Sequence, residues 1–492
     1  MNQRFKNKST KPIKIDFVDK VWLTLVSYSH EIRSICGFLL QNFEIHILIY
    51  KEFVMKRKKL LTLPLILALL TGCGAPAAQP ASGNASSEAA SNGAETATEQ
   101  ASEESSDAAT STTEASANAA NDASSEASSE STADDVTAKP GPAKDKYDMR
   151  DITPTDLVAE MKTGWNLGNT FDSFGTTGVE AETSWGNPKT TKEMIDAVNE
   201  KGFDCIRIPV TWADHLGAAP DYTIDEAWFD RVEEVVNYAL DDNMYVIINS
   251  HHEEEWRIPD DAHIDAVDEE VKAIWVQIAN RFEKYGDHLI FEGLNEPRVK
   301  GGTNEWSGGT GEGRKCLDRL NQTFVDAVRS TGGNNEKRLV LITSFASSHV
   351  IPTIGSMKIP EDDHLAVSIH AYTPYDFTYS ASGNSYDTWD GSHKGDIAGV
   401  MQDLQRIFGV KGIPVLLTEY GAEDKNGNSK EVCNWVTEYL TRAKKAGIPC
   451  FWWDNGLFES GNEHFAIFNR NDCSWYREDV ADAIMAVYNE EK

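Results

Sequence analysis

The sequence predicts an α/β fold, a single (β/α)8 barrel of the TIM type that follows a long unstructured segment. Three observations carry this prediction. Eight short apolar runs lie along residues 145–492, amphipathic stretches of helical period separate many of them, and a tract of small and acidic residues precedes them all. Such alternation is typical of βα units around a parallel sheet, and eight strands are enough to close a barrel.

The tract before the domain, residues 74–144, is predicted to be a disordered linker. From Gly74 to Ala138 it consists almost entirely of Ala, Ser, Thr, Glu, Asp, Gly, Asn and Pro, and it contains no Lys, Arg or aromatic residue. A segment of this composition cannot bury enough apolar surface to fold. Its carboxylates contribute much of the net charge of −32, and such a surface repels nucleic acid, which we therefore do not expect as a partner.

Residues 55–73 have the pattern of a secretory signal peptide. A basic stretch follows Met55, an apolar run covers residues 60–70, and the sequence Leu-Thr-Gly-Cys ends at Cys73. These last four residues resemble the bacterial lipobox, whose cysteine carries the lipid anchor, and the apolar run is too short to span a bilayer. We expect translation to start at Met55, residues 1–54 to be an untranslated or unstructured upstream segment, and the product to be an extracellular cell-surface lipoprotein of a bacterium, held at the membrane only through Cys73.

Each element of the barrel has its own local signal in the sequence. The strands are short apolar runs, and several of the helices begin at a Thr, Asp or Ser that can cap the first turn. The predicted strands cover residues 164–168, 205–210, 245–249, 289–294, 339–343, 365–369, 414–418 and 450–453. The predicted helices include 191–201, 226–241, 271–285, 315–330 and 429–446. The glycine-rich stretch 301–313 is expected to be a loop.

Polar or aromatic side chains recur at the C-terminal ends of the predicted strands. Barrel enzymes assemble their sites there, because all eight strands end on the same face. One such residue alone could be a satisfied polar group of the core, but the recurrence from strand to strand indicates a site. In chain order these residues are Asn166, Asn169, Arg207, His251, His252, Asn295, Glu296, His370, Tyr372, Glu419, Trp452 and Trp453.

Glu296 and Glu419 are suited to breaking a glycosidic bond. That reaction needs an acid to protonate the leaving oxygen and a negative group to meet the oxocarbenium-like carbon, so two carboxyl groups must flank one point. The two glutamates end the fourth and seventh predicted strands, which face each other across a barrel mouth. Arg207 and Tyr372 could donate hydrogen bonds to Glu419 and keep it ionised, as a nucleophile requires.

Glu296 is then the predicted acid/base. It must hold a proton near neutral pH, which burial and the negative charge of Glu419 would favour. His370 could orient Glu296 by a hydrogen bond, and Asn295 could bind a sugar hydroxyl beside the scissile bond. Either glutamate considered alone could also belong to an ordinary turn, since Glu-Pro and Glu-Tyr-Gly are common turn sequences.

Eight segments make the domain resemble glycoside hydrolase family 5, also called cellulase family A. They are GWNLGNTFD (164–172), ETSWGNP (182–188), FDCIRIPVTW (203–212), VIINSHHE (246–253), FEGLNEP (291–297), SIHAYTPYDFT (368–378), LLTEYGA (416–422) and FWWDNG (451–456). The resemblance implies a retaining hydrolase whose acid/base and nucleophile follow strands four and seven. By this resemblance the functional residues are Arg207, His251, Asn295, Glu296, His370, Tyr372, Glu419 and Trp453. The first two segments look like the branch of the family that is rich in endoglucanases, xyloglucanases and lichenases.

The expected substrate is an extended β-1,4-glucan that is cut internally. Aromatic rings can stack on the C–H faces of β-glucose, and amide and imidazole groups can bind its hydroxyl edges. The predicted stacking residues are Trp165, Trp185, Trp212 and Trp453, and the predicted edge contacts are Asn166, His251, His252 and Asn295. A register change of one residue would exchange His251 with His252, or Trp452 with Trp453, so these two choices stay open.

Other functions remain possible at this point. Xyloglucan or mixed-linkage β-glucan could replace linear β-1,4-glucan, and a non-catalytic surface glycan-binding lipoprotein is a further alternative. A metal-dependent barrel enzyme that uses His251 and His252 is disfavoured, because the first strand offers no His-x-His pair. The seven cysteines show neither a paired framework nor the spacing of a zinc site. We therefore expect no metal, no cofactor and a monomeric protein.

Overall fold

A computed structural model describes residues 140–489, apart from 254–256, 380 and 459–462. The predicted upstream segment 1–54, the signal peptide with Cys73, and the linker as far as residue 139 lie outside the described residues. Residues 140–144, which we assigned to the linker, already contact the domain, since the Arg150 guanidinium donates a hydrogen bond to the Gly141 carbonyl at 3.2 Å. No helix in the described part of the chain is both long enough and apolar enough to cross a membrane.

Eight parallel strands close into a barrel, which confirms the predicted fold class. Each strand pairs with its neighbours in the sequence, and the last strand returns to pair with the first. All eight predicted strands are present, with ends that differ by a few residues. The strands are β1 (Thr163–Leu167), β2 (Cys205–Ile208), β3 (Tyr245–Asn249), β4 (Leu289–Glu292), β5 (Val340–Ser348), β6 (Leu365–His370), β7 (Val415–Tyr420) and β8 (Cys450–Asp454).

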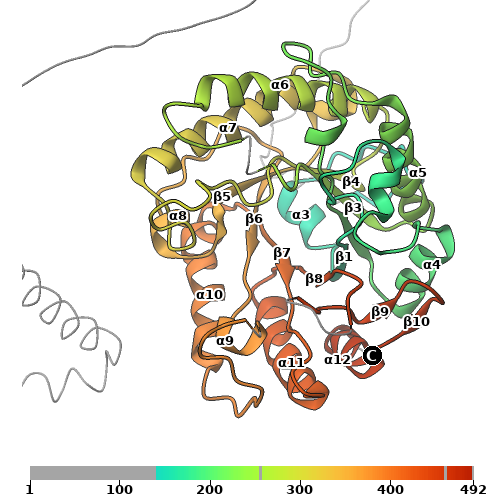
Figure 1. Ribbon diagram of the computed structural model, residues 1–492, viewed down its shortest axis with the longest axis vertical. Coiled ribbons are helices and arrows are strands. Elements are labelled where there is room, and N and C mark those ends of the chain that lie inside the picture. The colour runs from blue at the N-terminus through green and yellow to red at the C-terminus, as the bar shows by residue number, and fades with distance from the viewer. Residues whose placement is uncertain (1–139, 254–256, 380, 459–462, 490–492) are drawn as a thin grey trace, which may run out of the picture. The chain divides into compact units, whose positions relative to one another are not determined.

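Helices lie in a ring around the barrel (Figure 1). The longer ones are α4 (Lys192–Lys201), α5 (Glu226–Asp241), α6 (Ile264–Arg281), α7 (Gly311–Arg329), α10 (Lys394–Ile407), α11 (Ser429–Lys445) and α12 (Glu478–Asn489). The short elements are α3 (Pro154–Val158), α8 (Ile351–Ile354), α9 (Tyr375–Thr378), η1 (Val179–Thr183), η2 (Ala213–His215), η3 (Gly333–Glu336), η4 (Gly409–Lys411), β9 (Phe468–Asn469) and β10 (Ser474–Trp475). The predicted helices for α4, α5 and α11 agree with the structure to within one residue at either end.

Two helices begin earlier than predicted. Helix α6 begins at Ile264 rather than 271, because Ile264 and Val267 are buried although their neighbours are acidic. Helix α7 begins at Gly311 rather than 315, and its glycines lower the intrinsic helix propensity of the first turn. Thr310 compensates as the N-cap, since its hydroxyl accepts a hydrogen bond from the Gly313 amide at 2.9 Å.

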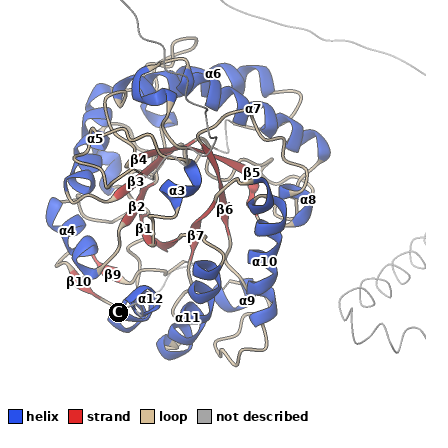
Figure 2. Ribbon diagram, turned by 180° about the vertical axis from the view of Figure 1, so that it is seen from behind, coloured by secondary structure: helices blue, strands red, loops and turns tan. Residues whose placement is uncertain are grey.

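The barrel is closed at the N-terminal ends of its strands. Leu157 and Val158 of α3 share one apolar cluster with inward residues of the strands, among them Tyr245, and α3 lies in front of the barrel in the view from behind (Figure 2). Gly164 leaves room for the Phe451 ring, because a Cβ atom at position 164 would lie only 2.1 Å from a ring carbon. Within the described part of the chain, these side chains fill this end of the barrel and leave the opposite end for a ligand.

The inward side chains change from apolar to polar towards that opposite end. Residues two positions apart on a strand share a face, so each apolar residue is followed by a second inward residue nearer the mouth. The apolar layer contains Cys205, Ile247, Ile290, Leu341, Ala366, Leu416 and Phe451. The next layer contains Asn166, Arg207, Asn249, Glu292, Thr343, Ser368, Thr418 and Trp453. We call this second set the polar layer.

A β-bulge near the end of β7 changes which side chain faces the barrel axis. Ile369 pairs with Leu417, but the next residue on β6, His370, pairs with Glu419, so that Thr418 is the extra residue. A bulge of this kind re-aims the residues that follow it. Strict alternation would direct Glu419 away from the interior because Thr418 points inward, whereas the bulge allows both side chains to reach the mouth.

Candidate active site

Arg207 is the centre of the polar layer and is fully buried. Its Nε donates to Glu292 Oε2 at 2.6 Å, and its Nη1 donates to Glu419 Oε1 at 2.8 Å. Its Nη2 donates to Asn295 Oδ1 at 2.7 Å, and Nη1 also reaches Asn166 Oδ1 at 3.0 Å. One guanidinium group therefore fixes residues from β1, β4, β7 and the loop after β4.

Glu419 is held through both of its carboxylate oxygens. Arg207 binds Oε1, as described above, and the Tyr372 hydroxyl donates to Oε2 at 3.0 Å. His370 Nδ1 lies 3.5 Å from the same Oε2. Both hydrogen-bond donors approach a side chain that is only 5% exposed, so its orientation is fixed.

Glu296 lies beside Glu419 and is hydrogen-bonded to His370. His370 Nδ1 is 2.8 Å from Glu296 Oε1, so the ring donates to the carboxylate when Nδ1 carries a proton and accepts from the carboxylic acid when it does not. One carboxylate oxygen of Glu296 and one of Glu419 lie within 4.8 Å of each other. Two carboxyl groups at this separation are typical of retaining glycosidases, whereas inverting enzymes leave about 6.5–9.5 Å for a water molecule.

The charges in this group shift its pKa values. Burial raises the pKa of Glu419 above its usual 4.5, and Glu296 raises it further, while His370 and Arg207 lower it. Burial lowers the pKa of His370, but the charge of Glu419 and the hydrogen bond with Glu296 outweigh this effect and raise the pKa above 6.5. Burial keeps the pKa of Tyr372 well above 10, so the hydroxyl remains a donor.

We predict that kcat/KM for a soluble β-glucan falls on the acid side with an apparent pKa above 4.5. Glu419 must be ionised to act as a nucleophile, and its pKa is raised, so lowering the pH removes the active form earlier than for an ordinary glutamate. Tyr372→Phe removes a donor to the ionised form and should move this limb to still higher pH. A pH profile of kcat/KM for both proteins checks the prediction, and a limb at or below 4.5 would contradict it.

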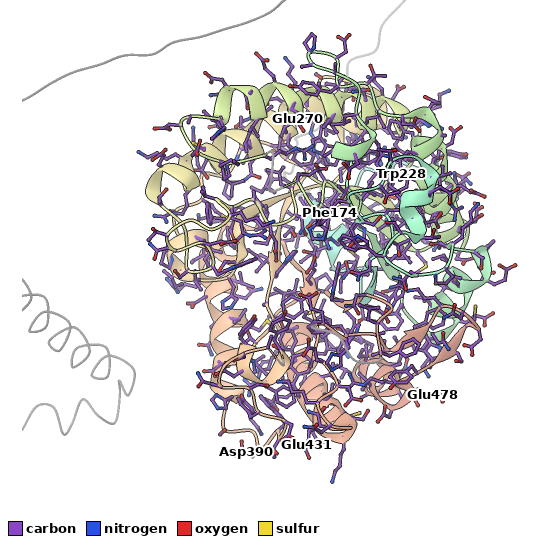
Figure 3. The ribbon with its side chains drawn as sticks, viewed as in Figure 1. Phe174, Trp228, Glu270, Asp390, Glu431 and Glu478 are labelled. Carbon is purple, nitrogen blue, oxygen red and sulfur yellow. The ribbon has the colours of Figure 1, made fainter. Side chains whose placement is uncertain are left out.

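An aromatic strip leads from the polar layer to the rim of the mouth. The Trp453 ring is parallel to the His251 ring, with centroids 5.7 Å apart. The centroids of the His251 and His252 rings are 4.5 Å apart. The His252 ring in turn packs against the rings of Trp185 and Phe174, with centroid separations of 5.7 Å and 5.5 Å. Phe174 is 44% exposed and lies over the middle of the barrel in the view onto the mouth (Figure 3). We call these five residues the aromatic strip.

Of the two choices of register that the sequence left open, these contacts separate the two tryptophans, whereas both histidines take part in the strip. Trp453, not Trp452, belongs to the polar layer, since Trp452 is fully buried and packs outward against Trp435 of α11. His251 and His252 both belong to the aromatic strip, in which His251 is buried and His252 is half-buried. Burial lowers the pKa of His251 well below 6.5, so it is neutral.

Three residues predicted to bind sugar are fully buried and do not face the mouth of the barrel. The Asn166 side chain is fully buried, and its Nδ2 donates to the carbonyls of Thr418, Phe451 and Trp452. It therefore positions Arg207 and the strand ends and does not contact a ligand. Trp165 and Trp212 are also fully buried, because Trp165 packs on Phe468 of β9 and Trp212 packs on Phe229 of α5. Asn295, which is bound to Arg207 through Oδ1, remains at the site.

Two charged residues of the site were missed by the sequence analysis. Glu292 is fully buried and pairs with Arg207, and Arg298 lies beside Glu296, with Nη1 3.6 Å from its Oε2. The signal for Glu292 was present, because a charged residue within an apolar strand requires a partner of opposite charge. Arg298 lies in the loop after β4, where no periodicity in the sequence indicates which way a side chain points.

Two groups of side chains within the described residues could in principle hold a metal ion. They are Asp172 with His251 and His252, and Glu296 with His370 and Glu419, each with ligand atoms within 4.8 Å of one another. In the first group the Asp172 carboxylate already accepts hydrogen bonds from the amides of Asn169 and Thr170. Activity that survives a strong chelator would distinguish acid–base chemistry from metal chemistry at either group.

The chain is similar to a well-defined set of proteins. The model of the family described as cellulase (glycosyl hydrolase family 5) matches residues 168–459. Endoglucanase A of Ruminococcus albus is 61% identical over 340 residues, which cover 69% of this chain and 93% of that protein. A solved structure of a GH5 xyloglucan-specific endo-β-1,4-glucanase from a metagenomic library, in complex with cellotriose, shares 45% identity with a TM-score of 0.66 and covers 68% of this chain and 98% of its own. A second solved structure is the GH5-4 broad specificity endoglucanase from Ruminococcus champanellensis with bound cellotriose. It shares 44% identity with a TM-score of 0.67, and the match covers 68% of this chain and 99% of that chain.

Proposed function

Because this chain belongs to glycosyl hydrolase family 5, the cellulase family, we propose that it hydrolyses internal β-1,4-glucosidic bonds of β-glucans by double displacement. The observation that carries this proposal is the pair Glu296 and Glu419, whose carboxylate oxygens lie within 4.8 Å of each other at the mouth of the barrel. Two carboxyl groups this close can act on opposite faces of one anomeric carbon.

In the first step Glu419 attacks the anomeric carbon while Glu296 gives its proton to the leaving oxygen. The bond from carbon to the leaving oxygen breaks and an ester to Glu419 forms, so the negative charge of Glu419 disappears. Arg207 keeps a counter-charge throughout, because Glu292 remains bound to its Nε at 2.6 Å. This second partner avoids an unpaired buried cation in the intermediate.

In the second step Glu296 acts as a base. It removes a proton from water, the water oxygen attacks the anomeric carbon, and the ester bond to Glu419 breaks. His370 supports both roles, since it can donate to the Glu296 carboxylate or accept from the acid at the same 2.8 Å contact. Two inversions at one carbon give net retention of configuration.

The aromatic strip supports a β-glucan as the substrate. Trp453 can stack on the sugar next to the scissile bond, and Trp185 and Phe174 provide further aromatic rings towards the rim. Relatives at 44–45% identity are a xyloglucan-specific and a broad specificity endoglucanase. For this reason xyloglucan and mixed-linkage β-glucan are the second candidate substrates.

We predict internal cleavage of carboxymethylcellulose, barley β-glucan or xyloglucan. The viscosity of the polymer solution should fall rapidly while few reducing ends have been released, because a strip that reaches an open rim does not require a chain end. Viscometry combined with a reducing-end assay checks this. Xylan or mannan as the best substrate, or monomer as the sole product, would contradict the proposal.

The N-terminal region suggests where the enzyme acts. We propose that cleavage before Cys73 and lipidation of this residue anchor a monomeric catalytic domain outside the bacterial cell, with the linker as a tether. The support is the sequence of residues 55–138. Cell fractionation tests it: Cys73→Ser should move the protein from the membrane fraction to the soluble fraction, and unchanged membrane association would contradict the anchor.

A further inference from the structure

Glu292 is a charged residue of the polar layer that lies out of reach of a ligand. Its side chain is fully buried on β4, and a carboxylate inside a barrel costs free energy unless it is paired. Its Oε2 accepts from Arg207 Nε at 2.6 Å, and its Oε1 accepts from the Ser368 hydroxyl. A donor on each oxygen is the arrangement that suits an ionised carboxylate.

Arg207 is therefore bound by two carboxylates at once. Its Nε donates to Glu292, and its Nη1 donates to Glu419 at 2.8 Å. All three side chains are buried, so water screens these charges weakly. The three residues carry one positive and two negative charges while Glu419 is free, and one of each once Glu419 has formed its ester.

The charge of Glu292 affects the two reaction steps in opposite directions. If Glu419 were the sole anionic partner of Arg207, ester formation would leave a buried guanidinium group without a counter-charge. Glu292 removes this cost, and its negative charge also disfavours the ionised form of Glu419 in the free enzyme. Both effects favour formation of the ester and disfavour its hydrolysis.

The same carboxylate is connected to the bulge that turns Glu419 inward. Ser368 uses its hydroxyl proton for Glu292, so in the contact between the hydroxyls of Ser368 and Thr418 the donor is Thr418. Thr418 is the extra residue of the bulge. One chain of hydrogen bonds thus joins β4, β6 and β7 next to the nucleophile.

We propose that Glu292 is a positioning residue that sets the balance between formation and hydrolysis of the ester at Glu419, because it shares Arg207 with the nucleophile. This inference rests on the proposed function and extends it to a residue that touches neither the substrate nor the reacting atoms. Ser368 and Thr418 maintain the geometry, whereas the charge of Glu292 sets the relative rates of the two steps.

The first test measures the two steps separately with dinitrophenyl 2-deoxy-2-fluoro-β-cellobioside. The fluorine slows both steps, so the enzyme is inactivated as the ester forms and recovers as water hydrolyses it. Glu292→Gln keeps the shape of the side chain and removes its charge. Inactivation should be about tenfold slower and reactivation about tenfold faster than in the wild type. Reactivation that is unchanged or slower, or inactivation that is not slowed, would overturn the proposal.

The wild-type enzyme is measured first. Inactivation with the sugar attached to Glu419, identified by peptide mass, would support the double displacement. Its failure would contradict the proposed function itself. A normal result for the wild type together with the wrong pattern in Glu292→Gln would contradict only the role of Glu292.

Two control variants keep the charge and disturb the geometry. Ser368→Ala loses the hydroxyl between Glu292 and Thr418, and Glu292→Asp carries the carboxylate on a shorter side chain. Each should slow inactivation and reactivation together, because Arg207 retains two anionic partners. Faster reactivation in either control would show that the charge of Glu292 is not the cause of the effect. Thermal unfolding of each variant checks that it is folded.

The pH profile gives a second reading that needs no trapping reagent. The charged and titratable groups that face Glu419 are Arg207, His370, Tyr372 and Glu296. Without the charge of Glu292, Arg207 stabilises the ionised form of Glu419 more strongly and lowers its pKa. The acid limb of kcat/KM should therefore move about one unit to lower pH in Glu292→Gln. A limb that stays in place or moves to higher pH would contradict the proposal.

A structure of the trapped wild-type enzyme tests the inference without any variant, so the proposal stays testable if Glu292→Gln does not fold. Arg207 should remain bound to Glu292 through Nε after Glu419 has formed its ester, as it is at 2.6 Å in the free enzyme. A guanidinium group that has moved away from Glu292 would show that this residue does not supply the counter-charge.

Discussion

Glu419→Ala is expected to abolish hydrolysis of every β-glucoside, with a loss in kcat of more than about 10⁴-fold. The variant removes the group that forms the ester, so substrates with good leaving groups should be affected as strongly as polysaccharides. The fold should tolerate the change, because Glu292 still balances the charge of Arg207 in the variant. Circular dichroism and thermal unfolding of the variant would confirm that it is folded.

Azide provides a positive test of the same assignment. In Glu419→Ala a small anion can occupy the space of the missing carboxylate and attack an activated aryl β-cellobioside directly. One inversion gives the α-glycosyl azide. Residual hydrolysis that is reduced only for polysaccharides, or an azide product of β configuration, would contradict the role of Glu419 as nucleophile.

Glu296→Ala is expected to have a selective effect. Hydrolysis of β-glucan should fall about 10²–10⁴-fold, because general acid catalysis typically contributes this factor. The first step on a dinitrophenyl β-cellobioside should proceed nearly normally, since that leaving group requires no proton. A burst of dinitrophenol followed by a slow steady state would show that the intermediate accumulates when the base is absent.

Azide should accelerate the second step of Glu296→Ala and not the first. It attacks the ester at Glu419 with a second inversion, so the product should be the β-glycosyl azide. His370→Gln is a useful comparison, because it removes the 2.8 Å contact to Glu296 while it retains the acid itself. An α-azide from Glu296→Ala would mean that the two glutamates exchange roles.

The barrel could be predicted because its signals are local. A buried parallel strand needs a short apolar run, and the helices between strands have one apolar face, so the strand count and most helix positions follow from periodicity. The beginnings of α6 and α7 could not be placed in this way. Acidic residues around Val267 and the glycines at 311 and 313 weaken the local signal. Burial of Ile264 and Val267 stabilises the first turn of α6, and the Thr310 cap stabilises that of α7.

The site was predictable in outline because barrel strands end on one face. Glu296, Glu419 and the residues around them are brought together as expected. The direction of a side chain was harder to predict where regular alternation fails. The bulge at Thr418 turns Glu419 inward, and no property of that sequence indicates the extra residue.

The function of a polar side chain depends on which partner it meets. Asn166 carries an amide group, which suits a sugar hydroxyl. In the structure this amide is already hydrogen-bonded to three main-chain carbonyls and to Arg207. Glu292 and Arg298 were missed because their partners lie far away in the sequence or in a loop. The closed barrel determines the pairing of Glu292 with Arg207, and the conformation of the loop after β4 determines that of Arg298.

The stereochemistry of the first product tests the central claim most directly. Proton NMR of the hydrolysis of a β-1,4-glucan oligosaccharide or an aryl β-cellobioside, recorded before mutarotation, shows which anomer forms first. Glu296 and Glu419, with oxygens within 4.8 Å of each other, predict the β-anomer through two inversions. The α-anomer as the first product would contradict the double displacement and the role of Glu419 as nucleophile.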